Sequence, residues 1–267
     1  MLSKRATRGF PTMTFADKFV QTDFGRIHYI DEGAGEVILL THSGGASLHE
    51  FDDVVEDLSK RARVIAWDVP GHGDSAPATQ HYSFHDYARA AVGLLDALGI
   101  EKAHVAGCSL GGMLSITLAA HHAERLGRAV IIDAQLRRKE WWAENWTWIE
   151  DMFAETVQPW DKVAPRFRAL DEKTFRQWNI DRQKAGTHAM IDVLWAAREY
   201  DLLDDLGAMK VPVMMMAGAV GPTMDSLDEF RSRVPGGRVE ILEECGHFLM
   251  IDKPAEFQQV LLDFLEI

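Results

Sequence analysis

The chain is poor in cysteine, in positive charge and in long apolar runs, and each shortage excludes a class of protein. Two cysteines in 267 residues, Cys108 and Cys245, are too few for a disulfide framework. A formal net charge of −13 argues against a nucleic-acid partner, because phosphate binding needs a basic surface. No apolar run is long enough for a membrane span or a signal peptide. We therefore expect a cytoplasmic protein that acts on a small hydrophobic or aromatic molecule, with no membrane partner.

Strand-like and helical stretches alternate along most of the chain, which predicts an α/β fold with a mainly parallel sheet flanked by helices. Residues 1–14 are expected to be a flexible leader in which Met13 offers an alternative start. Between residues 134 and 210 the pattern is helical and contains no strand candidate. We therefore expect a core formed by residues 15–133 and 211–267, with an inserted helical cap at 134–210. Strands are expected at residues 26–30, 37–41, 63–67, 104–108, 129–133, 211–217 and 238–242.

A nucleophile elbow is predicted at residues 104–112, where a β-branched strand runs into Gly-Cys-Ser-Leu-Gly and then a helix expected at 110–121. A serine on a sharp strand-to-helix turn needs nearly absent side chains two residues to either side, and Gly107 and Gly111 meet that need. The amides at the start of the helix favour negative charge that develops at the serine. Ser109 is therefore the candidate nucleophile, although Gly-x-Ser-x-Gly also occurs by chance in loops. Its neighbour Cys108 is expected to be a packing residue.

A nucleophilic serine requires a base and donors for an oxyanion. His247, in Gly-His-Phe between the last expected strand and a terminal helix, is the best-placed histidine. In the loop after the first buried strand, Thr-His-Ser-Gly-Gly, small residues let backbone amides approach a substrate oxygen. We expect the oxyanion donors to be the amide of Leu110 and that of Ser43 or Gly44. A purely structural glycine turn is the alternative for this loop.

Four motifs now stand in order: His-Ser-Gly-Gly, Asp-Val-Pro-Gly-His-Gly-Asp-Ser, Gly-Cys-Ser-Leu-Gly-Gly and Gly-His-Phe. Together they resemble the α/β-hydrolase superfamily over nearly the whole chain. The resemblance implies that superfamily's fold and points to a hydrolase, although a fold alone does not fix a reaction. The second motif, at residues 68–75, is expected to be structural.

The chain departs from that pattern at the acid of the triad. Most members of the superfamily carry an aspartate shortly after the strand that follows the cap, and Gly221 stands at that position here. Asp133, which ends the strand before the cap, faces the same crevice and is the best substitute to orient His247. It could also serve only as a cap or turn residue. Asp225 and Asp228 are weaker candidates.

Two subfamilies with an acid before the cap resemble this chain. Zearalenone-type lactonases are similar in the Gly-Cys-Ser elbow, in a carboxylate at the Asp133 position and in Gly-Ala-x-x-Pro-Thr at residues 218–223, but they carry a different pair in place of His42-Ser43. Cofactor-less 3-hydroxy-4-quinolone 2,4-dioxygenases are similar in an acid at the Asp133 position, a histidine like His247 and no acid after the later strand.

Seven of the chain's eight tryptophans lie in the expected cap. Such rings suit the wall of an apolar cavity, although an aromatic stripe at helical spacing more often packs helices together. The candidate substrate-binding residues are His42, Trp141, Trp142, Trp146, Trp160 and Trp195.

Three functions remain open at this point. The favoured one is a serine hydrolase of a hydrophobic ester or lactone, with Ser109, His247 and Asp133 as the triad. A second is a cofactor-independent dioxygenase of a 3-hydroxy-4(1H)-quinolone, in which His247 and Asp133 form the base and Ser109 only binds substrate. A third is a catalytically idle fold that binds a hydrophobic signal molecule or a partner. We expect no cofactor, and no metal site, because no set of histidines, cysteines and carboxylates has ligand spacing along the sequence.

Overall fold

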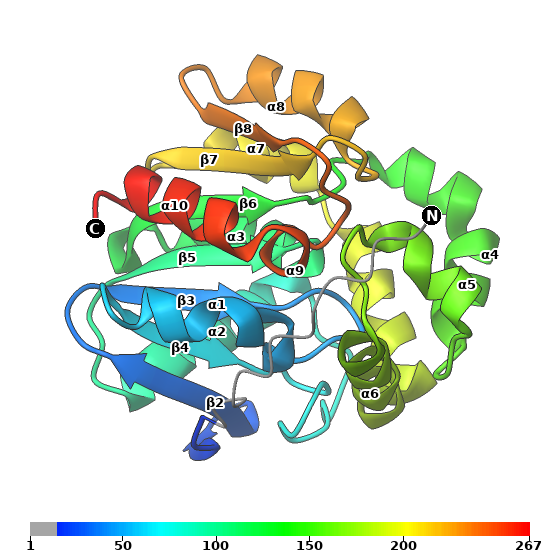
Figure 1. The fold of residues 1–267 in the computed structure, drawn as a ribbon, viewed down its shortest axis with the longest axis horizontal. Coiled ribbons are helices and arrows are strands. Elements are labelled where there is room, and N and C mark those ends of the chain that lie inside the picture. The colour runs from blue at the N-terminus through cyan, green and yellow to red at the C-terminus, as the bar shows by residue number, and fades with distance from the viewer. Residues whose placement is uncertain (1–14) are drawn as a thin grey trace, which may run out of the picture.

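An eight-stranded sheet forms the centre of the computed structural model, which describes residues 15–267 (Figure 1). Its spatial order is β1-β2-β4-β3-β5-β6-β7-β8; β1 and β2 are antiparallel to their neighbours, and the rest of the sheet is parallel. The expected α/β class with a mainly parallel sheet is thus confirmed, while the expected leader and Met13 lie outside the described residues. The strands are β1 (Lys18–Thr22), β2 (Gly25–Gly33), β3 (Val37–Thr41), β4 (Arg63–Trp67), β5 (Ala103–Cys108), β6 (Leu126–Ile132), β7 (Val213–Gly218) and β8 (Arg238–Leu242).

Two layers of helices cover the sheet, and each has its own apolar core. One face carries α1 (Asp52–Leu58), α9 (Leu249–Asp252) and α10 (Pro254–Leu265), which contact one another in front of the strands in Figure 1. The other face carries α2 (Phe84–Ala97), α3 (Leu110–His121), α7 (Leu202–Ala208) and α8 (Leu227–Arg233). Because β7 is buried along its whole length, its sequence is a continuous apolar run. Short 3-10 helices lie at Leu48–Phe51, Ala123–Arg125, Ala164–Arg166 and Met224–Ser226.

All seven expected strands are present, and one strand was missed. The missed strand is β1, a short edge strand whose side chains are exposed or half-buried, so its sequence has no apolar face to reveal it. The helix expected at 110–121 has those bounds as α3. None of the described helices combines the length and the apolarity needed to cross a membrane.

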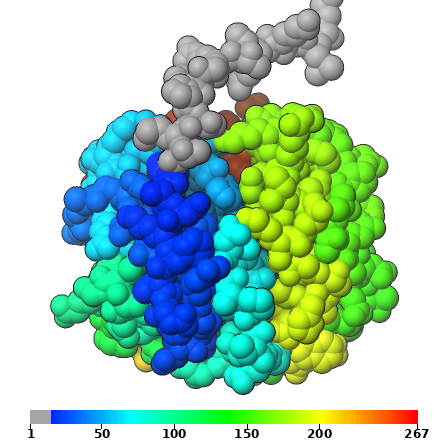
Figure 2. Space-filling model, turned by 90° about the horizontal axis from the view of Figure 1, so that it is seen from below, coloured from blue at the N-terminus to red at the C-terminus, as the bar shows by residue number. Residues whose placement is uncertain are grey.

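The chain between β6 and β7, residues 133–212, is helical and is called here the β6–β7 segment. It contains α4 (Lys139–Ala154), α5 (Trp160–Val163), α6 (Glu172–Glu199) and α7. Helices α4 to α6 lie beyond the carboxyl ends of the parallel strands, on the right of Figure 1. Figure 2 shows the loop after β4 (cyan) between the N-terminal strands (blue) and α6 (yellow-green). Two ion pairs, each 2.6 Å long, join α6 to the loop after β4: Lys184 with Asp74, and Asp192 with His81.

The parallel strands end in register, which sets the residues that follow them side by side. Cys108 pairs with Ile132, and Ile132 with Met216. The ladder continues one residue further, because Ser109 N–H donates to the Ile132 carbonyl and Asp133 N–H donates to that of Met216, each over 2.8 Å. Ser109 and Asp133 thus emerge from neighbouring strands at one edge of the sheet.

Candidate active site

Ser109 occupies a sharp turn between β5 and α3. Its φ of 54° and ψ of −109° lie in a region that residues other than glycine rarely adopt. The turn closes because its neighbours lack side chains: a Cβ on Gly107 would lie 2.1 Å from the Gly111 carbonyl oxygen, and one on Gly111 would lie 2.2 Å from that of Thr41. Ser109 is also the N-cap residue of α3, so the first amides of that helix lie beside it.

His247 is held by Asp133. The imidazole Nδ1 and the carboxylate Oδ2 are 2.5 Å apart, and the Asp133 side chain is fully buried. The other oxygen, Oδ1, accepts hydrogen bonds from the Thr223 hydroxyl at 2.5 Å and from the Gly218 amide at 3.3 Å. With Nδ1–H donated to the carboxylate, Nε2 keeps its lone pair and can accept a proton.

Residue 221 must lack a side chain for the Asp133 carboxylate to lie where it does. A Cβ on Gly221 would lie 2.9 Å and 3.0 Å from the two Asp133 carboxylate oxygens. The alternative acids point elsewhere, because Asp225 pairs with Arg137 at 2.7 Å and Asp228 is an exposed residue bonded to Arg231.

A cavity of about 480 Å³ contains both Ser109 and His247 in its wall. Its size is that of a site for a small organic molecule. Leu110, Ser43 and Gly44 also line it, as do two of the expected tryptophans, Trp141 and Trp142. Trp148 and Trp178, two more of the seven tryptophans of the expected cap, also belong to the wall, as does Phe248 of the Gly-His-Phe motif. The sequence did not single out Phe153, Arg166 and Arg182, which line it as well.

In the loop after β3, the Ser43 amide is engaged in a hydrogen bond, whereas the Gly44 amide makes none within residues 15–267. The Ser43 amide donates to the Glu50 carboxylate at 3.1 Å, and the Ser43 hydroxyl donates to the same oxygen at 2.5 Å. The Ser43 amide is therefore already engaged, which leaves the Gly44 amide as the candidate donor of the two. Sequence reasoning missed Glu50, because nothing in a local motif distinguishes it from an ordinary surface glutamate.

Glu50 is buried below this loop. Burial raises the pKa of its carboxyl group, whereas the hydrogen bonds from Ser43 lower it. Its Oε1 has no hydrogen-bond partner in the described part of the chain. The carboxyl group thus holds the backbone and the hydroxyl of Ser43 in place.

His42 and three of the five expected tryptophans lie outside the cavity wall. His42 is buried, and both its ring nitrogens are engaged: Nδ1 donates to its neighbour's carbonyl at 2.7 Å and Nε2 accepts from the Val69 amide at 3.1 Å. Trp146 and Trp195 pack edge to face with ring centres 5.0 Å apart, and Trp160 packs against a phenylalanine. Helical periodicity identified the tryptophans but not the direction of each ring.

Arg166 and Arg182 also line the cavity, and neither guanidinium group has a carboxylate partner among residues 15–267. Burial lowers the pKa of Arg166; burial and the charge of Arg166 together lower the pKa of Arg182 to about 10. Arg182 donates to backbone carbonyls at the end of α4, including that of Glu155 at 2.7 Å. The cavity is therefore apolar and aromatic with a positively charged patch.

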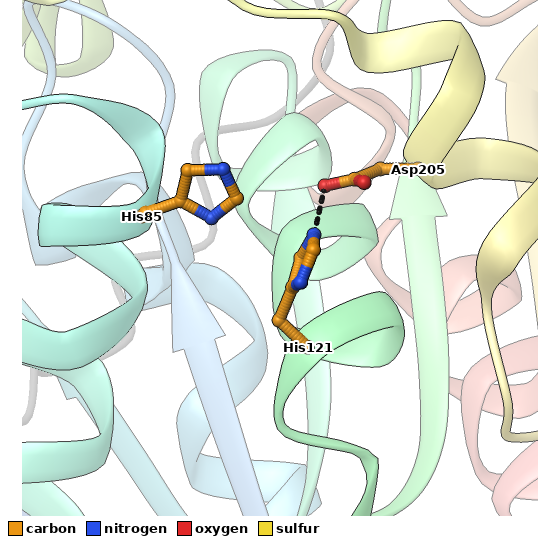
Figure 3. Close-up of side chains that lie close together, drawn as sticks. All are labelled: His85, His121 and Asp205. Carbon is orange, nitrogen blue, oxygen red and sulfur yellow. Dashed lines mark hydrogen bonds and ion pairs between the residues drawn. The ribbon is translucent and has the colours of Figure 1, made fainter.

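A second group of side chains lies far from this cavity in the fold. His85, His121 and Asp205 come together although they are widely separated in the sequence (Figure 3). The expectation of no metal-ligating set rested on sequence spacing, and spacing cannot detect a group drawn from three helices. The three side chains therefore form a group that sequence spacing did not reveal.

Comparisons with known proteins place this site in a family. A family model described as alpha/beta hydrolase fold matches residues 36–184, more than half of the chain. The 3-oxoadipate enol-lactonase 1 of Acinetobacter baylyi is 25% identical, over 86% of this chain and 88% of its own. The 2-hydroxy-6-oxo-6-phenylhexa-2,4-dienoate hydrolase of Comamonas testosteroni is 26% identical, over 90% of this chain and 91% of its own. The crystal structure of an enol-lactonase from Burkholderia xenovorans has a TM-score of 0.82 at 25% identity and covers 94% of this chain and 100% of that one. The chain therefore belongs, as an enzyme, to the alpha/beta hydrolase fold family.

Proposed function

We propose that this protein is a serine hydrolase that cleaves a hydrophobic ester or lactone. One observation carries the proposal: Ser109, on its strained turn, and His247, held by the buried Asp133, line the same cavity. The names of the similar proteins support it, because an enol-lactonase is among the relatives and among the similar structures.

In the proposed reaction, His247 Nε2 takes the proton of the Ser109 hydroxyl while the Ser109 oxygen attacks the substrate carbonyl carbon. The amides of Leu110 and Gly44 donate to the oxyanion of the tetrahedral intermediate. Asp133 stays ionised and stabilises the imidazolium. His247 then protonates the leaving alkoxide, which remains attached to the acyl chain when the substrate is a lactone. Water, activated by the same histidine, releases the acyl group.

Helices α4 to α6 of the β6–β7 segment serve as a cap over Ser109 in this proposal. Trp141 and Trp142, from α4, contact the apolar part of the substrate. The remaining expected tryptophans hold the cap helices together instead. The proposed core is 15–133 with 211–267, and the proposed cap lies within 134–210, whose last helix, α7, packs with α3 in the helix layer on the sheet.

The unpaired guanidinium groups favour a substrate that carries a negative charge. Arg166 is half-buried and has no carboxylate partner in the described part of the chain, so a substrate carboxylate beside it would form a charge-assisted hydrogen bond. The relatives named for 3-oxoadipate and for a phenylhexadienoate support this preference. Arg166→Met is expected to raise KM about 10- to 100-fold for carboxylate-bearing esters and leave KM for neutral esters nearly unchanged. Equal effects on both substrate series would contradict this assignment.

The function is tested by replacing the proposed catalytic residues and assaying a panel of esters, lactones and the phenylhexadienoate named for the relative. Ser109→Ala and His247→Ala are each expected to lower kcat by about 10⁴-fold or more, with little change in stability. Ser232→Ala, at an exposed position on α8, is the matched control. A fluorophosphonate probe is expected to label Ser109 in the unmodified enzyme. A Ser109→Ala enzyme that keeps most of its activity refutes the proposal.

A cofactor-independent 2,4-dioxygenase is the second candidate, and one observation favours it. The His247–Asp133 bond is intact, whereas no hydrogen bond joins the Ser109 hydroxyl to His247 in the described part of the chain. In that reaction the histidine would deprotonate a 3-hydroxy-4(1H)-quinolone, whose anion reacts with O₂. Turnover of the quinolone that requires oxygen and releases carbon monoxide is its signature. Undiminished turnover without oxygen excludes it.

A further inference from the structure

We propose that His85, His121 and Asp205 form a binding site for a divalent transition-metal ion of the zinc class, separate from the catalytic cavity. His85 belongs to α2, His121 is the last residue of α3 and Asp205 belongs to α7. Each offers one ligand atom, and these atoms all lie within 4.8 Å of one another (Figure 3). A metal held there would join three helices on one face of the sheet.

The spacing of the ligand atoms is close to that of a zinc site. Bonds of about 2.0–2.2 Å from nitrogen or oxygen to zinc put the ligand atoms of a tetrahedral ion roughly 3.3–3.5 Å apart. His121 Nε2 and Asp205 Oδ2 are already 2.6 Å apart in a hydrogen bond, and the ring of His85 lies edge to face against that of His121 with centres 4.6 Å apart. Both histidines are exposed, so small side-chain rotations bring the three atoms to one ion.

The surroundings hold the carboxylate in place and favour a cation. The Tyr200 hydroxyl donates to Asp205 Oδ2 and itself accepts from the Thr117 hydroxyl at 2.7 Å. Outer partners of this kind orient metal ligands and tune their affinity. His121 ends α3, where the helix dipole is negative and the last carbonyls stabilise positive charge.

The ligand types select the ion. Two imidazoles and one carboxylate suit zinc, copper, nickel or cobalt, whereas magnesium and calcium prefer sets made of oxygen. Three protein ligands leave at least one position for water. The site is remote from the proposed nucleophile, because α3, about 18 Å long, has Ser109 at one end and His121 at the other. The bound ion therefore acts on the stability of the helix layer rather than on the reacting atoms.

The test uses the full chain without a polyhistidine tag, stripped of metal by a chelator. Zn²⁺ is titrated in competition with a chromophoric chelator, and Co²⁺ is added separately to record its visible spectrum. We expect one ion per chain, an intense absorption of Co²⁺ with nitrogen and oxygen ligands at low coordination number, and a rise in the thermal unfolding temperature.

Variants decide where the ion binds. His85→Ala and His121→Ala are each expected to weaken zinc binding by more than about 100-fold and to abolish the thermal shift. This loss is larger than the roughly 10- to 100-fold loss of affinity that follows when a residue behind a metal ligand is replaced. His122→Ala, next to the cluster in sequence, and His81→Ala, paired with Asp192, are the matched controls and should bind as the parent does. Absence of saturable binding up to millimolar zinc, or binding that survives His121→Ala, overturns the proposal. Since these residues lie outside the catalytic cavity, the outcome is independent of the proposed hydrolysis.

Discussion

The absence of a side chain at position 221 makes room for the carboxylate that holds His247. Asp133 is buried, and its oxygens accept hydrogen bonds from His247, Thr223 and the Gly218 amide. A Cβ at position 221 would lie about 3 Å from the same oxygens. The site therefore depends on a residue that contributes only space.

Gly221→Ala tests that dependence. The added methyl group would lie about 3 Å from both Asp133 oxygens and should push the carboxylate away from His247. We expect kcat to fall about 10- to 100-fold and the free energy of unfolding to fall by about 1–3 kcal/mol. Steady-state kinetics and urea unfolding measure the two effects.

Gly93→Ala in α2 is the matched control, because nothing lies within 4 Å of its added Cβ. It should leave kcat unchanged and stabilise the helix by roughly 0.5–1 kcal/mol. A Gly221→Ala enzyme with full kcat would show that the Asp133–His247 contact tolerates the crowding, and so contradict the argument.

At the scale of elements, the end of α4 depends on a neighbouring helix. The last carbonyls of α4 have no partner within the helix, and the Arg182 side chain from α6 donates to those of Met152 and Phe153 and to that of Glu155. A buried positive charge also complements the helix dipole there. Because α4 carries Trp141 and Trp142, Arg182 supports a wall of the cavity from outside the reacting centre.

Arg182→Met is expected to leave the Phe153 and Glu155 carbonyls without this donor, whereas that of Met152 still accepts from the Gln158 amide. The free energy of unfolding should fall by about 1–3 kcal/mol. The amides of the last turn of α4 should exchange hydrogen faster than in the parent. Hydrogen exchange followed by mass spectrometry gives the local readout. Arg176→Met, on the same helix but exposed and paired with the exposed Glu172, should change neither quantity. Unchanged exchange at the end of α4 in Arg182→Met would rule out the capping role.

How far the sequence predicts this structure depends on how local each feature is. The turn around Ser109 carries its geometry in its own glycines, so it could be identified without a fold. Asp133 could be inferred because the regular acid position is empty. Other features depend on how helices and strands pack against one another, which no short stretch of sequence encodes. They are the ring directions of Trp146 and Trp195, the contact of Glu50 with Ser43 and the meeting of three helices at His121.

At the scale of the whole molecule, one buried carboxyl group should tie stability to pH. Asp181, on α6, is buried and accepts from the Gln177 amide at 2.7 Å. Burial raises the pKa of its carboxyl group from 3.8 to about 7, although the Gln177 bond lowers it. The folded state therefore binds this proton more tightly than the unfolded chain. The resulting stabilisation is fully present below about pH 4 and is lost as pH rises to about 7.

Asp181→Asn removes this titration. Between pH 4 and pH 7.5, the unfolding free energy of the variant should rise relative to the parent by up to roughly 4 kcal/mol, because each unit of pKa shift corresponds to about 1.4 kcal/mol. Urea unfolding at a series of pH values measures the difference. Asp228→Asn, at an exposed position, should give a curve parallel to the parent. A constant offset between Asp181→Asn and the parent across the whole range would show that the group does not titrate there.

The uneven distribution of tryptophan has an optical consequence. Trp67, in β4, donates to the Thr41 hydroxyl inside the sheet, and the other seven indoles belong to the β6–β7 segment. Ultraviolet emission from this protein therefore comes mainly from the helices around the cavity, and four of those fluorophores, Trp141, Trp142, Trp148 and Trp178, form part of its wall. A molecule that enters the cavity changes the polarity and the quenching around these four rings. Intrinsic tryptophan fluorescence should therefore report ligand binding in the unlabelled enzyme.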